Sequence, residues 1–227
     1  MYARGVTTHP FSQKTLLKYG FKESALYISS GMERKYKEIM QKKTQRESVF
    51  IMYLYLSSPQ NHVLYPPSHH RQMILDIYRN LGVCPDLIDS HPVFELPSEE
   101  TTTNLKTDMS SMTAHIVVLS YGQNAAAQVK ANLKSLCLQR LETIYLHLPL
   151  NDKYTSVLTD QFEALGFFFS GIMPGDEGND ELILQYLNNY VIDYEQMQVA
   201  SEQGRELLDY VRKSDPNQVI YCDNSFR

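Results

Sequence analysis

Histidines and strand carboxylates are the side chains in this sequence best suited to acid–base chemistry. His115 and His147 fall in two apolar segments that are predicted to be neighbouring strands, so their rings can meet across a sheet. A neutral imidazole there can act as a general base toward an amine, and a structural histidine held by hydrogen bonds is the alternative. Three carboxylates on predicted strands could also serve as the base, with solvated positions as the alternative: Glu95, Asp108 and Glu181.

Metal-ligand patterns are weak in this chain. His69 and His70 are adjacent at a predicted helix start, where side chains of neighbouring residues point about 100° apart, which favours a surface pair over a chelate. The three cysteines, Cys84, Cys137 and Cys222, are too few and too scattered for a disulfide framework or a zinc site. The sequence therefore predicts no metal site.

Composition limits the kind of protein this is. The chain has 227 residues, 43% of them hydrophobic and 21% charged, which is typical of one or two globular domains. Its net charge of −5 argues against a nucleic-acid or membrane surface as partner. No apolar segment approaches the roughly 20 residues that span a bilayer. With few cysteines and no signal-peptide pattern, a reduced, cytoplasmic setting is expected.

Alternating strand and helix patterns predict the elements that position these side chains. Residues 114–121 form the most continuous apolar segment and are predicted to be a central strand. Ser68 is the expected N-cap of a helix that ends at Gly82. Further helices are predicted at residues 10–20, 124–141, 154–165 and 194–213, and further strands at 22–30, 49–56, 92–96, 101–112, 143–150, 167–173, 181–187 and 218–222.

One helix–strand unit occurs twice. A helix ends at Gly20-Phe21 and again at Gly166-Phe167, and an apolar strand follows each time. The two pairs are separated by about one domain length, and glycine is the residue that ends a helix in the left-handed conformation without strain. We therefore expect residues 1–31 to be the end of a first domain, 32–47 a linker and 48–227 a complete second copy.

The order of these elements resembles the GCN5-related N-acetyltransferase (GNAT) superfamily, in particular its tandem-domain members. The segments that carry the resemblance are TTHPFSQKTLLKYGF, YPPSHHRQMILDIYRNLG, TIYLHLPL, EALGFFFSGIMPG and ELILQYLNN. The resemblance implies an α/β fold with a central mixed sheet flanked by helices, preceded by a partial helix–strand unit.

In this superfamily an acetyl group passes from acetyl-CoA to an amine, and the resemblance implies where the cofactor would lie. Pantetheine would pair with the end of the central strand, and the pyrophosphate would meet N–H groups where the next helix begins. The corresponding residues are Val117, Leu119, Gly122, Gln123, Asn124 and Ala125. This loop lacks the arginine and the second glycine of the family pattern.

The usual proton donor of the family is also replaced. Many members carry a tyrosine five residues before the Phe of the Gly-Phe pair, where this chain has Phe162 and Leu16. Two hypotheses follow: an acetyltransferase acting on an amine or other small molecule, or a non-catalytic ligand-sensing or dimerisation module. The partial unit at residues 1–30 is expected to dock on the second domain's sheet or on another copy in a homodimer, because its strands would otherwise be unpaired.

Overall fold

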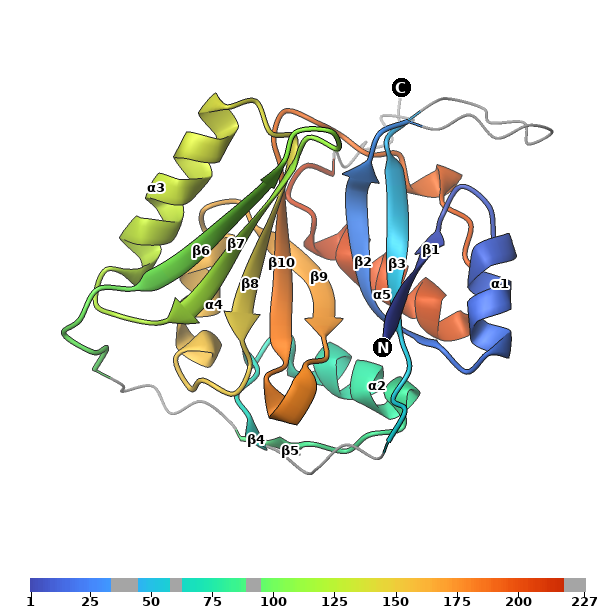
Figure 1. The fold of residues 1–227 in the computed structure, drawn as a ribbon, viewed down its shortest axis with the longest axis horizontal. Helices are drawn as coiled ribbons and strands as arrows, with labels where there is room; N and C mark the ends of the chain where they lie inside the picture. The colour runs from blue at the N-terminus through green and yellow to red at the C-terminus, as the bar shows by residue number, and fades with distance from the viewer. Residues whose placement is uncertain (34–44, 58–62, 89–94, 219–227) are drawn as a thin grey trace, which may run out of the picture.

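Eight strands form one mixed sheet in the order β1-β3-β2-β9-β10-β8-β7-β6, shown by the computed structural model (Figure 1). The structure describes residues 1–33, 45–57, 63–88 and 95–218. The strands of this sheet are β1 (Tyr2–Val6), β2 (Lys22–Gly31), β3 (Glu47–Tyr53), β6 (Thr102–Asp108), β7 (Thr113–Ser120), β8 (Thr143–Pro149), β9 (Phe168–Met173) and β10 (Glu181–Leu187). A separate two-stranded sheet consists of β4 (Val63–Leu64) and β5 (Asp86–Leu87).

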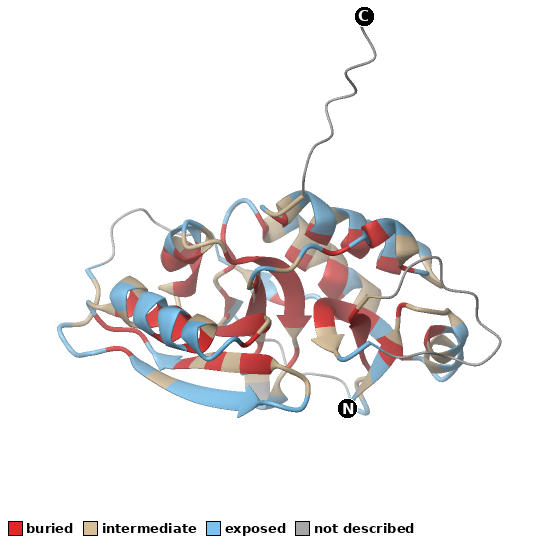
Figure 2. Cartoon of the chain, turned by 90° about the horizontal axis from the view of Figure 1, so that it is seen from above, coloured by how far each residue is buried: buried red, intermediate tan, exposed pale blue. Residues whose placement is uncertain are grey.

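Helices cover one face of the large sheet and leave much of the other face open. The helices are α1 (Phe11–Lys18), α2 (Arg71–Leu81), α3 (Ala125–Leu138), α4 (Thr155–Glu163) and α5 (Glu202–Ser214). Figure 1 shows α2, α4 and α5 behind the strands, and Figure 2 shows the buried residues concentrated between helices and sheet. This arrangement confirms an α/β protein with a mixed sheet flanked by helices.

The repeated unit seen in the sequence is repeated in space. The order β1-α1-β2-β3 matches β8-α4-β9-β10, and in each set the last strand lies between the other two. The two sets join edge to edge where β2 pairs with β9. The N-terminal unit therefore docks on the second unit's sheet within the same chain, one of the two arrangements expected from its unpaired strands.

A glycine and two side chains make the junction of β2 and β9 possible. Ala25 pairs with Gly171, whose φ is +131°, and a Cβ there would lie 2.4 Å from the Ala25 Cα. Farther along β2, backbone groups of Ile28 bond to side chains: its N–H donates to Gln185 Oε1 (3.0 Å), and its carbonyl accepts from Tyr145 (3.1 Å). Side chains thus satisfy backbone groups that would otherwise be buried without partners.

Two strands have different neighbours from those expected. The strand expected to open the second domain, β3, hydrogen-bonds with β1 and β2 and so completes the N-terminal unit. The predicted central strand, β7, lies second from the sheet edge, beside the exposed β6. Its apolar character comes from Ala114, Ile116 and Val118, which face the core under the helices.

Helix boundaries differ from prediction at two places. Residues 68–70 form a turn, so His70, and not Ser68, is the N-cap of α2; Gly82 ends it in the left-handed conformation, as predicted. The predicted helix at residues 194–213 is a short 3-10 turn, Tyr194–Gln196, followed by α5. Most of each predicted strand at 92–96 and 218–222 lies outside the described residues, as does most of the 32–47 linker. None of the described helices has the length and apolarity needed to cross a bilayer.

Candidate functional site

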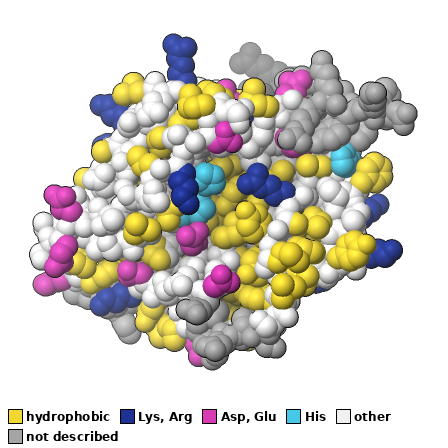
Figure 3. Space-filling view, viewed as in Figure 1, with side chains coloured by type: hydrophobic (Ala, Val, Ile, Leu, Met, Phe, Trp, Pro, Cys, Tyr) yellow, Lys and Arg dark blue, Asp and Glu magenta, His cyan; other side chains and the backbone are white. Residues whose placement is uncertain are grey.

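The open face of the sheet carries a hollow of about 310 Å³ between the two repeated units. Figure 3 shows histidine side chains at the centre of this face, with basic side chains on either side. The residues that line the hollow come from all eight strands of the sheet: Tyr2 and Arg4 of β1, Tyr27 of β2, Ile51 of β3, Lys106 of β6, His115 and Val117 of β7, His147 of β8, Met173 of β9 and Glu181 of β10. We call this set the sheet-face hollow.

A chain of hydrogen bonds crosses the floor of the hollow. His147 Nδ1 lies 2.7 Å from Glu181 Oε2, and His147 Nε2 lies 2.8 Å from His115 Nδ1. The parallel pairing of β7 with β8 and the antiparallel pairing of β8 with β10 bring the three side chains together, because all three point to the open face. The meeting of His115 with His147 confirms the sequence prediction.

The carboxylate at one end sets the proton positions along this chain. Glu181 accepts from His147 Nδ1–H, so in a neutral ring Nε2 of His147 is an acceptor. His115 then donates from Nδ1, and its own Nε2 keeps a lone pair. Burial, assisted by the charges of His147, Arg4 and Lys106, lowers the pKa of His115 to about 4. His115 is therefore neutral near pH 7 and can accept a hydrogen bond.

Two buried tyrosines support the histidines from below. Tyr145 stacks on Tyr27 with ring centroids 4.3 Å apart, and His115 stacks on the same Tyr145 at 5.0 Å. Burial raises the pKa of both phenols, so both rings are uncharged. The stack belongs to a small apolar cluster on the open face, separate from the main core. It fixes the plane of the His115 ring.

The predicted cofactor residues lie where β7 and β8 part. The parallel pairing ends at Val117 and His147, and beyond it Leu119 is 59% exposed. Gly122 is buried against another segment, and a Cβ there would lie 2.0 Å from the carbonyl oxygen of Glu99. Glycine at 122 is thus required by the chain's own backbone.

The loop that was expected to meet a pyrophosphate already bonds to residues 99–101. The Gly122 N–H donates to Thr101 Oγ1 at 2.9 Å, and the Gln123 N–H donates to Glu99 O at 3.2 Å. Asn124 Oδ1 accepts from the Thr101 N–H at 2.8 Å, and Ala125 is the buried first residue of α3. Two N–H groups of the predicted phosphate loop therefore have protein partners.

The position of the expected proton donor is part of the core. Phe162 is fully buried on α4, and Leu16 is partly buried on α1. Of the other carboxylates considered, Asp108 accepts from Ser110 and Ser111 in the β6–β7 turn, and these hydrogen bonds lower its pKa to about 2. Glu95 is exposed, and its carbonyl accepts from Tyr154. Neither carboxylate reaches the hollow.

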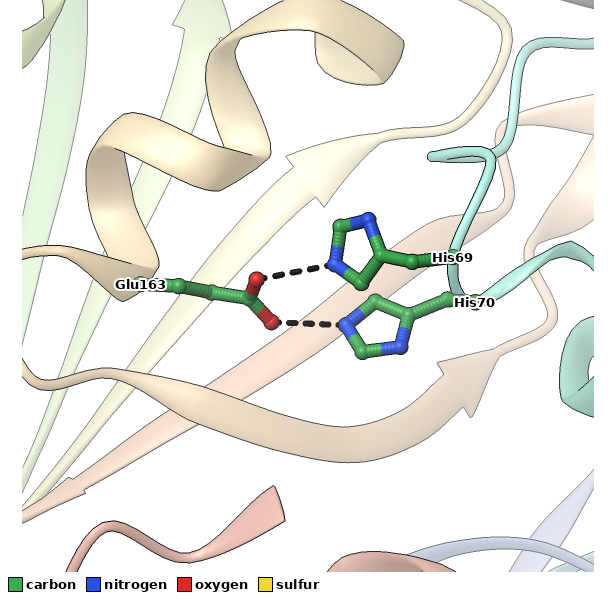
Figure 4. Close-up of side chains that lie close together, drawn as sticks. All are labelled: His69, His70 and Glu163. Carbon is green, nitrogen blue, oxygen red and sulfur yellow. Dashed lines mark hydrogen bonds and ion pairs between the residues drawn. The ribbon is translucent and has the colours of Figure 1, made fainter.

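A second cluster lies on the helix-covered side, at His69 and His70 (Figure 4). His69 Nε2 is 2.8 Å from Glu163 Oε2, and His70 Nε2 is 2.7 Å from Glu163 Oε1. The expectation of a diverging surface pair was wrong, because the two residues belong to the turn before α2 and helical spacing does not apply. Their ring centroids are 4.0 Å apart, and His70 is only 3% exposed.

Electrostatics in this cluster follow from the shared carboxylate. Hydrogen bonding to Glu163 raises the pKa of His69, whereas burial lowers the pKa of His70. Burial alone would raise the pKa of Glu163, but hydrogen bonds from both histidines outweigh it and lower the pKa to about 2. Glu163 is therefore a carboxylate throughout the neutral range.

Sequence reasoning did not find the basic residues of the hollow or the partner of the histidine pair. Arg4 is on a short N-terminal strand, and Lys106 is on a strand that is exposed along most of its length. Glu163 looks like an ordinary polar residue on an amphipathic helix. The packing of segments that are distant in the sequence places all three, and no local pattern marks them.

Comparisons with known proteins give this chain no relative. No protein-family model, no curated protein and no solved structure matches it.

Proposed function

We propose that the sheet-face hollow binds a small organic anion that also donates a hydrogen bond, such as a hydroxy- or amino-carboxylate. The observation that carries the proposal is the hydrogen-bonded chain of His115, His147 and Glu181 lying between two basic side chains. The chain then acts as a ligand-sensing module, in line with the non-catalytic hypothesis.

Arg4 and Lys106 supply the positive charge. Both line the hollow, and neither has an ion-pair partner within the described part of the chain. A guanidinium and an ammonium group that face a shared hollow attract a carboxylate, and hydrogen bonds between charged partners are about twice as strong as neutral ones.

His115 supplies specificity for a ligand that carries an N–H or O–H group. Its Nδ1–H is already given to His147, so Nε2 is the atom left to accept. The remaining wall is apolar, from Ile51, Val117 and Met173, and suits a short carbon skeleton. A volume of about 310 Å³ lies at the lower end of the range for small-molecule sites.

Acetyl transfer from acetyl-CoA to an amine, as in the GNAT superfamily, is the second candidate. It is favoured by the separation of β7 from β8 beyond Val117, next to the hollow. An amine bound beside His115 would then lie near a cofactor placed along Val117 and Leu119. The occupied N–H groups of Gly122 and Gln123 and the buried Phe162 make it the weaker candidate.

A cytoplasmic setting accords with the free thiols of Cys84 and Cys137.

Thermal-shift titration tests the first candidate. We expect at least one member of a panel of 2-hydroxy- and 2-amino-carboxylates to raise the Tm of the full chain, because a ligand that binds the folded state stabilises it. The shift should shrink in Lys106→Met and in His115→Gln. It should persist in Lys130→Met, which removes the same charge from the exposed side of α3.

Two outcomes would overturn the proposal. One is the absence of any shift with the whole panel, and the other is an equal shift in the wild type and in Lys106→Met. A separate titration with acetyl-CoA decides the second candidate, which requires a shift that Leu119→Asp reduces.

A further inference from the structure

We propose that His69, His70 and Glu163 form a binding site for one divalent transition-metal ion, with Zn²⁺ as the best-matched ion. The three side chains offer two imidazole nitrogens and a carboxylate oxygen within 4.8 Å of one another. Zn²⁺ takes this donor set, and a site with three protein ligands leaves its fourth position to water or substrate.

A hydrogen bond behind the His70 ring and a carboxylate behind the His69 ring orient the metal-facing nitrogens. Tyr210 donates its hydroxyl proton to the His69 carbonyl (3.1 Å), so it accepts from His70 Nδ1, 2.8 Å away. Asp160 Oδ1 lies 3.4 Å from His69 Nδ1. With a metal ion bound, these partners favour a proton on Nδ1 of each ring and leave Nε2 as the ligand atom. Outer partners of this kind are usual for metal-binding histidines.

The contacts with Glu163 identify the protons that a metal ion would displace. Without a metal ion, His70 Nε2 donates to Glu163 Oε1 at 2.7 Å, and His69 Nε2 donates to Oε2 at 2.8 Å. Imidazole binds a metal through a deprotonated nitrogen, so an ion bound here would replace these two protons. The same three side chains that now converge through hydrogen bonds would then converge on one metal ion.

The surroundings give the site a rigid wall and an entrance. The centroid of the Phe169 ring lies 4.6 Å from that of His70 and 5.1 Å from that of Tyr210. This packing holds the His70 ring in place. The His69 side chain is 40% exposed, so an ion and its water can enter from that side. For tetrahedral coordination, Glu163 at the end of α4 must draw back by only about 0.5 Å from each nitrogen.

Zinc titration of the full chain by calorimetry, after chelator treatment and dialysis, tests the site. We expect one Zn²⁺ per chain, and affinity at least about tenfold weaker in His69→Gln and in Glu163→Gln, because each removes a ligand. Co²⁺ should give the visible absorption of a tetrahedral site in the wild type and lose it in both variants. His70→Gln is avoided because His70 is buried.

His147→Gln is the matched control, since it removes a histidine from the other cluster and should bind Zn²⁺ as the wild type does. Circular dichroism without metal verifies that each variant is folded. Equal affinity in all four proteins would overturn the proposal, as would the absence of binding to the wild type at micromolar Zn²⁺.

Discussion

Both histidine clusters contain two rings and one carboxylate, but the residues are connected in different ways. In the sheet-face hollow the carboxylate of Glu181 is at the end of a line, so the line terminates in one open acceptor on His115. At the other cluster, the Glu163 carboxylate accepts one hydrogen bond from His69 and one from His70. A linear chain suits recognition of a hydrogen-bond donor, whereas a convergent set suits a cation.

The depressed pKa of His115 makes a pH prediction. The folded protein holds this ring neutral down to about pH 4, whereas an ordinary histidine takes up a proton near pH 6.5. Between these values the unfolded chain binds more protons, so the free energy of unfolding must fall as the pH falls. Replacing His115 with Gln should remove roughly 1–3 kcal/mol of that fall.

Urea unfolding at a series of pH values measures this difference. The free energies of unfolding of the wild type and His115→Gln should converge as the pH drops from 6.5 toward 4. The other charged and titratable groups around His115 are the same in both proteins, so the difference between the curves reports His115 itself: Arg4, Lys106, His147, Asp108 and Glu181. Parallel curves across this window would contradict the burial of a neutral His115.

At the scale of elements, the junction of β2 with β9 depends on Gly171. Gly171→Ala forces a Cβ to within 2.4 Å of the β2 backbone and strains a φ of +131°. We expect a loss of about 3 kcal/mol or more in the free energy of unfolding, because backbone cannot move aside as a side-chain tip can. Denaturant unfolding followed by circular dichroism measures it.

Gly82→Ala is the matched control for that prediction. Gly82 also has a positive φ, +74°, but a Cβ there meets nothing within 4 Å. Gly82→Ala should lower the free energy of unfolding by only about 1 kcal/mol, the cost of placing alanine in the left-handed conformation. Equal losses in the two variants would show that the close approach of β2 and β9 is unimportant for stability.

Prediction from sequence succeeded where the signal is local. The left-handed ends at Gly20, Gly82 and Gly166 and the strands β7 to β10 follow from apolar periodicity and glycine placement. It failed where tertiary pairing decides. The turn at residues 68–70 replaced an expected helix start, and this single difference turned His69 and His70 toward Glu163.

For the whole molecule, the two repeated units form one continuous sheet. Pattern recognition found the repeat but not that β3 completes the first unit, because β3 is separated from β2 by a charged segment and no local signal states which strand it pairs with. The sheet-face hollow is a product of this union, since Arg4 and Tyr27 come from one unit and His147 and Glu181 from the other. Dimerisation through the N-terminal unit stays a prediction, which the oligomeric state in solution tests.

Removing residues 1–31 should destroy the fold. The deletion strips both neighbours from β3 and leaves β9 as an unpaired, apolar edge, a feature that promotes aggregation. It also removes Gln13, whose side chain bonds to Val6 O, Gln198 O and the Ala200 N–H and so ties α1 to the segment before α5. We expect insoluble protein or the loss of a cooperative thermal transition, whereas deleting only residues 1–6 leaves β2 paired with β9 and should give a soluble chain with a lowered Tm. Size-exclusion chromatography and calorimetry distinguish the two deletions. A monodisperse chain without residues 1–31 that kept the Tm of the full-length protein would show that the second unit folds without its partner, and that the hollow is assembled between independent parts.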